Sequence, residues 1–195
     1  MGAGRRIIKW RGALFMDILQ AIQTRCSYRG RYLSAAVPRE DLTRILEAGL
    51  AAPSGCNKQT TSLIAVDDPA MLSRLNALIQ PPVGQTDTAP AMICVLTRRI
   101  NAYRDRCYAV QDYAAAIENM LLTIVALGYQ SCWIEGHVTD DDHIGRQMAN
   151  VLGVPDEYEL VCYLPVGIAA EPARRTAKKQ PFESRAWFNG FGKNA

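Results

Sequence analysis

The sequence predicts a single α+β or α/β domain in which a small sheet is covered by helices. Segments with helical periodicity outnumber strand-like segments, and four strand-like runs are separated from one another by helical ones. The 195 residues suffice for one domain with a full hydrophobic core. Apolar residues make up 49% of the chain, and no apolar run approaches the ~20 residues that span a bilayer. The sequence therefore favours a globular protein without a membrane segment.

The predicted helices follow apolar residues spaced three or four positions apart. They are expected over 16–24, from Pro38 to the turn cluster Pro53-Ser54-Gly55, and over 71–79, 108–127 and 140–152. The helix over 108–127 is apolar nearly all round, which indicates a central position or a subunit interface. Gly128 is expected to cap it.

The predicted strands are short apolar runs bounded by turn signals. They are expected over 61–66, 91–96, 131–134 and 160–166. The run at 91–96 is apolar without interruption, which is typical of a strand buried on both faces.

The charge distribution argues against a nucleic-acid-binding protein. The net charge is +3, but residues 1–15 hold four basic groups and no acid, so the remainder carries −1. This basic extension lacks the continuous apolar core of a secretory signal. We expect a disordered tail or an upstream start codon with Met16 as the functional beginning, followed by one domain over 16–195.

Cysteine and histidine usage favours a reducing cytoplasm and no metal site. The six cysteines form no Cys-x-x-Cys pair, and Cys94 and Cys162 fall inside apolar runs. The only histidines are His137 and His143, which makes a histidine-based nucleophilic triad or zinc site improbable. The acidic run at 140–142 is interpreted as a helix N-cap rather than a metal site.

The stretch Arg25-Cys26-Ser27-Tyr28-Arg29 is the first candidate for binding. Two guanidiniums and a hydroxyl stand on alternate positions just after a helix. Arginine offers a planar fork of donors that suits a phosphate or the polar edge of a flavin. A solvated basic surface patch is the alternative.

Three further stretches carry polar groups that could bind a cofactor. They are Ala52-Pro53-Ser54-Gly55-Cys56-Asn57-Lys58-Gln59, Cys132-Trp133-Ile134-Glu135-Gly136 and the basic run at 174–179. Taken alone, each also fits an ordinary loop, strand-to-helix turn or solvated tail. The chain has no Walker loop and no Gly-x-Gly-x-x-Gly, so a Rossmann dinucleotide site is unsupported.

In this order, the stretches resemble the nitroreductase family of FMN-dependent NAD(P)H oxidoreductases, from about Met16 to the C-terminus. The matching motifs are Arg-x-Ser-x-Arg at 25–29, Ala-Pro-Ser-Gly-x-Asn-x-Gln at 52–59, the long helix with Glu118-Asn119-Met120, Trp-Ile-Glu-Gly at 133–136 and Leu164-Pro165-Val166-Gly167 before the basic segment. The resemblance implies an α+β three-layer sandwich with a central, mostly antiparallel sheet flanked by helices. It also implies an intertwined homodimer with flavin at the subunit interface.

The resemblance assigns roles to particular residues. It places the phosphate, ribityl chain and pyrimidine edge of FMN against Arg25, Cys26, Ser27 and Arg29. It brings the loop at 53–59 to the flavin of the other subunit through Pro53, Ser54, Gly55, Asn57 and Gln59. It lays Ile134, Glu135 and Gly136 against the flavin ring, and it gives Lys179 a phosphate contact. The catalytic candidates are the backbone amide of Glu135, near the hydride-accepting N5, and the positive charge of Arg29, which favours the anionic reduced flavin.

The activity implied is hydride transfer from NADH or NADPH to FMN, followed by ping-pong reduction of a nitroaromatic, quinone or similar electrophile. A flavin-binding dimer without turnover, or a specialised member with dehalogenating or flavin-fragmenting chemistry, is the alternative. The chain departs from the family at Thr60-Thr61, where Pro-Trp is usual, and at Ala177, where a second phosphate-binding lysine is usual. The loop at 71–91 is also short. These departures leave the acceptor and the preferred pyridine nucleotide open.

Overall fold

The computed structural model describes residues 9–10, 13–14, 16–135, 138, 144–174 and 177–193. Its centre is a three-stranded sheet in the order β3-β4-β7, and both pairings are antiparallel. The strands are β3 (Thr61–Val66), β4 (Ala91–Thr97) and β7 (Glu159–Val166). Every residue of β4 is buried, which agrees with the uninterrupted apolar run in the sequence.

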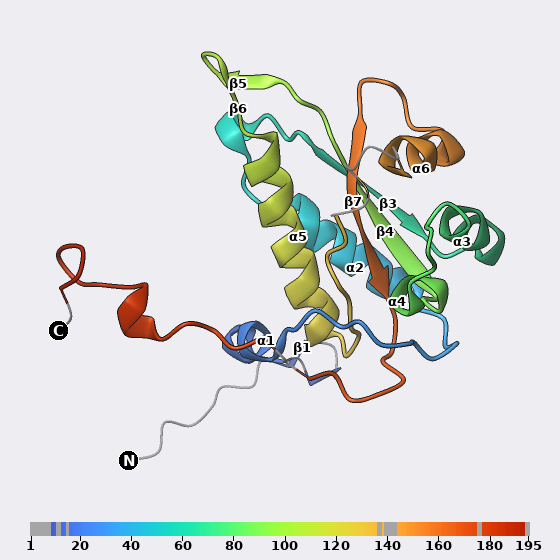
Figure 1. Ribbon diagram of the computed structural model, residues 1–195, viewed down its shortest axis with the longest axis horizontal. Helices are drawn as coiled ribbons and strands as arrows, with labels where there is room; N and C mark the ends of the chain where they lie inside the picture. The colour runs from blue at the N-terminus through green and yellow to red at the C-terminus, as the bar shows by residue number, and fades with distance from the viewer. Residues whose placement is uncertain are drawn as a thin grey trace.

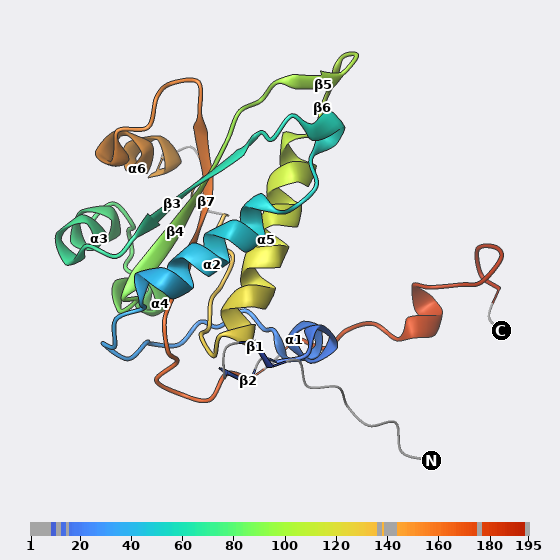
Figure 2. The same ribbon diagram turned by 180° about the vertical axis from the view of Figure 1, so that it is seen from behind.

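Helices cover both faces of this sheet (Figures 1 and 2). On one face, alternate residues of β4 pack with α2 (Arg39–Leu50) and α5 (Ala109–Ala126). On the other, the intervening residues pack with α3 (Pro69–Asn76) and α6 (Ile144–Leu152). Because successive side chains of a strand point to opposite faces of the sheet, β4 divides the core into two layers. The predicted α+β three-layer sandwich with an antiparallel central sheet is confirmed.

Local capping groups explain where several helices begin and end. Asp17 precedes α1 (Ile18–Thr24) and accepts a hydrogen bond from the Leu19 amide at 2.8 Å. Asp68 caps α3 by accepting from the Met71 amide at 2.7 Å, so this helix begins two residues before the predicted start. Gly128 follows α5 with a φ of 88°, a conformation that favours glycine.

The predicted strand over 131–134 is wrong. Only its two flanks pair with β7: Gln130 bridges Gly167, and Ile134 bridges Tyr163. Between them, the carbonyl of Ser131 accepts from the amide of Tyr28 at 2.9 Å. The pairing with β7 is therefore interrupted between these bridges, where the Ser131 carbonyl binds the segment after α1.

Several short elements were not predicted. They are α4 (Gly84–Asp87), the hairpin of β5 (Asn101–Tyr103) and β6 (Arg106–Cys107), and the 3₁₀ turns η1 (Gly55–Asn57) and η2 (Phe182–Ser184). Near the N-terminus, β1 (Lys9–Trp10) pairs with β2 (Ala13–Leu14). Whether the basic extension is a tail or an upstream start stays a prediction. The acidic run at 140–142 lies outside the described residues, so its capping role also stays one.

The chain leaves the body of the molecule after β7. Residues 177–193, here called the C-terminal arm, project away from the sheet and its helices (Figure 1). The arm exposes three large apolar side chains, Phe182, Phe188 and Phe191. No helix in the described part of the chain is long and apolar enough to cross a membrane.

Close packing of α6 on β7 depends on Gly145. A Cβ atom at this position would lie 2.7 Å from the carbonyl oxygens of Leu160 and Val138, which cannot rotate away. We expect Gly145→Ala to lower the free energy of unfolding by about 2 kcal/mol, because overpacking must displace backbone. Urea denaturation measures this change.

Gly49→Ala is the matched control, since this glycine also lies in a helix. An added Cβ would meet the flexible side chain of Met120 and a methyl of Leu63 at 2.8–3.0 Å. Alanine also has about 1 kcal/mol better helix propensity than glycine. Equal losses of unfolding free energy in Gly49→Ala and Gly145→Ala would contradict a specific requirement for glycine where α6 packs on β7.

Candidate functional site

Residues 25–29, here called the arginine cradle, form an extended segment directly after α1. Cys26 and Tyr28 are buried, whereas Ser27 and Arg29 are exposed and Arg25 is half-buried. Alternate side chains of an extended segment point to opposite sides. The basic and hydroxyl groups at 25, 27 and 29 therefore share the outward side, as an anion-binding segment requires.

The arginine cradle lies against the segment that follows α5. The amide of Tyr28 binds the carbonyl of Ser131, and Ser27 forms a hydrogen bond with the Cys132 thiol. Burial raises the pKa of Cys132, and the nearby charges of Arg29 and Arg25 lower it by less. Cys132 thus remains a neutral thiol at neutral pH.

The carboxylate of Glu135 is held by two donors. The indole Nε1 of Trp133 donates to it at 2.9 Å, and the hydroxyl of Tyr113 donates at 3.2 Å. Burial, followed by the charge of Glu135, raises the pKa of Tyr113 to about 12, so this phenol keeps its proton. The side chain of Glu135 is therefore fixed against the first turns of α5.

The backbone around Glu135 is fixed by the sheet. Ile134 exchanges two hydrogen bonds with Tyr163 of β7, at 3.2 and 3.0 Å. Among the described residues, no backbone carbonyl accepts from the amide of Glu135. This amide is thus a candidate donor to a bound group. Gly136, also predicted to line the site, lies outside the described residues.

The loop at 53–59 is anchored by a buried carboxylate that the sequence analysis missed. One oxygen of Asp112 accepts from the Gly55 amide at 2.8 Å, and the other accepts from the Thr60 hydroxyl at 2.7 Å. Asp112 is buried in the first turn of α5. The sequence signal for this role was an acid in the first turn of a mostly apolar helix.

The backbone of this loop adopts an unusual conformation. Cys56, Asn57 and Gln59 all have positive φ angles, between 49° and 53°. The side-chain oxygen of Ser54 accepts from the Gln59 amide at 3.0 Å. A Cβ on Gly55 would lie 2.6 Å from the ring of Tyr108, so the loop can approach α5 this closely only with glycine there.

The arginine cradle and the loop at 53–59 lie toward opposite ends of α5. The loop is bound at the first turn, whereas α1 packs near the other end of the helix (Figure 1). Among the described residues, no hydrogen bond or ion pair joins the two segments, and each is bound to a different part of the helix or of the chain after it.

Lys179 lies in the C-terminal arm and is exposed. No described hydrogen bond or ion pair connects it to the arginine cradle. Arg25 itself is 3.5 Å from the carboxylate of Glu118, in the middle of α5.

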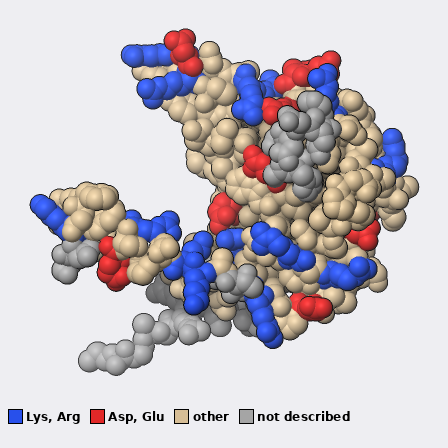
Figure 3. Space-filling model, viewed as in Figure 1, with Lys and Arg blue, Asp and Glu red and all other residues tan. Residues whose placement is uncertain are grey.

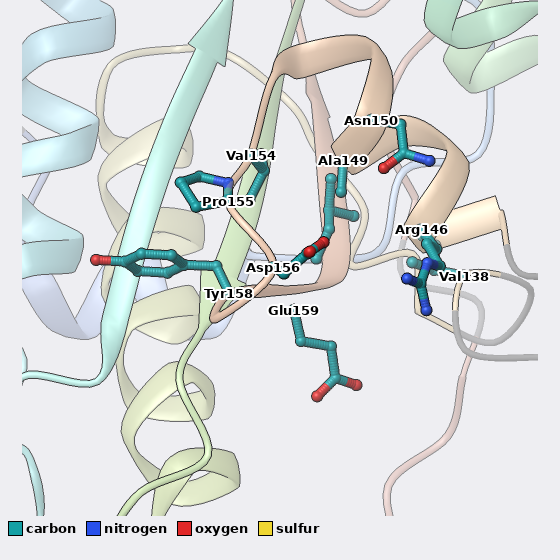
Figure 4. Close-up of a pocket in the computed structure, with 11 residues that line it drawn as sticks. Val138, Arg146, Ala149, Asn150, Val154, Pro155, Asp156, Tyr158 and Glu159 are labelled. Atoms are coloured by element: carbon teal, nitrogen blue, oxygen red, sulfur yellow. The ribbon is translucent and has the colours of Figure 1, made fainter.

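Two cavities lie away from these residues. One, of about 330 Å³, lies between α6 and the turn before β7, with Arg146, Asn150 and Asp156 at its wall (Figure 4). The other, of about 630 Å³, lies beside α3 and α4. Neither is lined by a residue of the predicted site. In the described part of the chain, no group of three or more His, Cys, Asp or Glu side chains could hold a metal ion.

Comparison with known proteins identifies a family match over most of the chain. The model of the nitroreductase family matches residues 22–83 and 82–168. A protein of Methanothermobacter thermautotrophicus, provisionally named an NADH dehydrogenase/NAD(P)H nitroreductase, is 28% identical over 156 residues. That match covers 80% of this chain and 79% of the relative.

Two similar crystal structures contain FMN. A nitroreductase with bound FMN from Bacteroides fragilis has a TM-score of 0.73 and 29% identity, over 89% of this chain and 100% of the other. A provisionally assigned nitroreductase in complex with FMN from Desulfovibrio desulfuricans has a TM-score of 0.72 and 28% identity, over 89% and 97%.

Removal of the Asp112 carboxylate should release the loop at 53–59. We expect Asp112→Ala to lower the free energy of unfolding by about 3 kcal/mol, because the buried Thr60 hydroxyl and the partly buried Gly55 amide lose a charged acceptor. Amide hydrogen exchange should become faster over residues 55–60 and stay slow in β4. Thr60→Val is the control: it removes one of the two bonds, so the Gly55 amide should remain protected. Unchanged exchange at Gly55 in Asp112→Ala would contradict the anchoring role.

Proposed function

The chain belongs to the nitroreductase family, and from this premise we propose that it is an FMN-dependent oxidoreductase that takes hydride from NADH or NADPH. The acceptors would be nitroaromatics, quinones or similar electrophiles. The outward row of Arg25, Ser27 and Arg29 carries this proposal. FMN bound in two similar structures supports it.

The donor chemistry of the arginine cradle fits FMN. Guanidinium groups bind phosphate through paired hydrogen bonds, and a hydroxyl between them can bind a ribityl chain. Cys26 would contribute by packing beneath this row, since its side chain is buried. Lys179 of the C-terminal arm would add a phosphate contact.

Bound FMN would supply the hydride chemistry, and the protein would supply binding, orientation and electrostatics. The positive charge of Arg29 would stabilise negative charge on the pyrimidine edge of the flavin. The amide of Glu135 would donate a hydrogen bond to the ring, with Ile134 and Gly136 beside it. Since the Glu135 carboxylate is already bound by Trp133 and Tyr113, its backbone rather than its side chain would serve the flavin.

We further propose a homodimer with a flavin at each subunit interface. The cradle and the loop at 53–59 are attached to different parts of α5. The Gly55 amide binds Asp112 in the first turn, whereas Arg25 lies near Glu118, in the middle of the helix. A second copy would bring Pro53, Ser54, Gly55, Asn57 and Gln59 to a flavin held by the first.

Exposed apolar side chains support an interface with a second copy. On α1, Ile18 and Leu19 are exposed by 59% and 64%, and the C-terminal arm exposes its phenylalanines. Large exposed apolar surface is typical of association sites. We also propose ping-pong turnover, in which one pocket admits the nucleotide and the acceptor in turn.

The six free thiols of the protein suit a reducing cytoplasm.

The visible spectrum of the purified protein tests the proposed function. We expect flavin absorption bands that bleach when NADH or NADPH is added without oxygen. Reoxidation by a quinone or nitroaromatic should restore the bands. Bands that persist with both nucleotides would indicate a flavin-binding protein without this activity, and no binding of added FMN would contradict the proposal entirely.

Arg29 should be needed for flavin binding. We expect Arg29→Ala to weaken FMN binding about tenfold or more, because one charged hydrogen bond contributes about 1.5–3 kcal/mol. Fluorescence titration of the apoprotein with FMN measures the change. Arg74→Ala, on α3 across the sheet, is the charge-matched control and should bind FMN normally. Equal affinities in the two variants would remove Arg29 from the site.

A further inference from the structure

The hairpin of β5 and β6 is a basic projection that the proposed function does not yet use. It stands out beyond the start of α5 (Figure 1), and basic side chains gather at its tip, at the upper left of Figure 3. Residues 98–107 contain four arginines and one acid, Asp105, whereas the rest of residues 16–195 carries a net charge of −4. This concentration of charge predicts an anionic partner.

The two arginines at the base of the hairpin already have partners. Arg99 forms a two-bond ion pair with Glu159 at the start of β7, at 2.5 and 3.2 Å. The Arg98 guanidinium lies 5.5 Å from the centre of the Tyr158 ring, and its amide binds the Thr60 carbonyl at 3.0 Å. These contacts fix the base of the hairpin and leave the tip for another role.

The tip combines an open aromatic ring with two guanidiniums. Tyr103 is 52% exposed, and the guanidinium carbon of Arg104 lies 5.2 Å from the centre of its ring. Arg104 and Arg106 are both exposed, and neither forms an ion pair with any described residue. An aromatic face can stack with a nucleobase, and arginine forks bind phosphate.

The hairpin and the loop at 53–59 form one structural unit. Besides the Arg98–Thr60 bond, Gly55 packs directly against Tyr108, the residue between the hairpin and α5. In the proposed dimer, this loop reaches the flavin held by the other subunit. The tip of the hairpin would then stand at the entrance of that flavin site.

We propose that the hairpin binds the adenosine end of NADPH and makes NADPH the preferred electron donor. Arg104 and Arg106 bind the 2′-phosphate, and Tyr103 stacks on the adenine. NADH shares the adenine but lacks this phosphate, so only NADPH gains the charged contacts. The inference rests on the proposed function, because it needs the flavin site of the dimer.

Binding of nucleotide fragments tests this assignment without turnover. We expect isothermal titration of the FMN-loaded protein to show adenosine 2′,5′-bisphosphate binding about tenfold tighter than 5′-AMP. In the double variant Arg104→Gln/Arg106→Gln, the two affinities should become equal. Equal affinities in the unchanged protein would overturn the proposal.

Steady-state kinetics tests the preference itself. We expect the double variant to raise KM for NADPH about tenfold and to leave KM for NADH within twofold. Asp105→Asn removes the only acid at the tip and should lower KM for NADPH. Arg74→Ala is the control and should change neither the KM for NADPH nor the KM for NADH. Tyr103→Leu should raise KM for both nucleotides, since both carry adenine.

The outcomes separate this inference from the proposed function. Reduction of the flavin by both nucleotides, with equal changes in the double variant, would refute the hairpin assignment and keep the oxidoreductase. No reduction by either nucleotide would refute the proposed function, whereas the fragment titration would still decide whether the hairpin binds a 2′-phosphate.

Discussion

Three segments of the candidate site contact residues of α5. Asp112 in its first turn holds the loop at 53–59, Tyr113 binds Glu135, and Glu118 lies near Arg25. The buried face of α5 packs on β4 and β7, so these attachment points are as rigid as the core itself. A single helix thus fixes three segments that are far apart in the sequence.

The arginine cradle and the loop at 53–59 are bound at different positions along this helix. The loop is bonded to Asp112 in the first turn, whereas Arg25 lies near Glu118, six residues further along. We propose that a site composed of both segments combines two copies of the chain. The exposed apolar residues of α1 and of the C-terminal arm give such an association a driving force.

The sequence predicts those parts of the structure that depend on periodic burial. Strand β4 was recognised because all its residues are buried, and α5 because its apolar positions recur at helical spacing. The residues at 131–134 look like a strand because most of them are apolar, yet only Ile134 pairs with β7, and the carbonyl of Ser131 binds Tyr28 instead. The hairpin was missed because its strands have only three and two residues, most of them exposed.

The sequence could predict those features of the candidate site that depend only on residues close together in the chain. The alternation of donors in residues 25–29 could be deduced from the sequence, because an extended segment displays every second side chain on one side. The positive φ angles of Cys56 and Gln59 could not, because neither residue type favours that conformation. The loop that contains them is held by contacts of Gly55 with Asp112 and Tyr108, more than fifty positions along the chain.

In the proposed dimer, each flavin site combines the cradle of one chain with the loop of another. The direct measurement uses differently tagged Arg29→Glu and Asn57→Asp chains, each of which should retain FMN poorly as a homodimer. In the purified heterodimer, one site would have both changes and the other neither. We expect this heterodimer to bind one FMN with normal affinity. A heterodimer that binds FMN as poorly as both homodimers would show that each site lies within one chain.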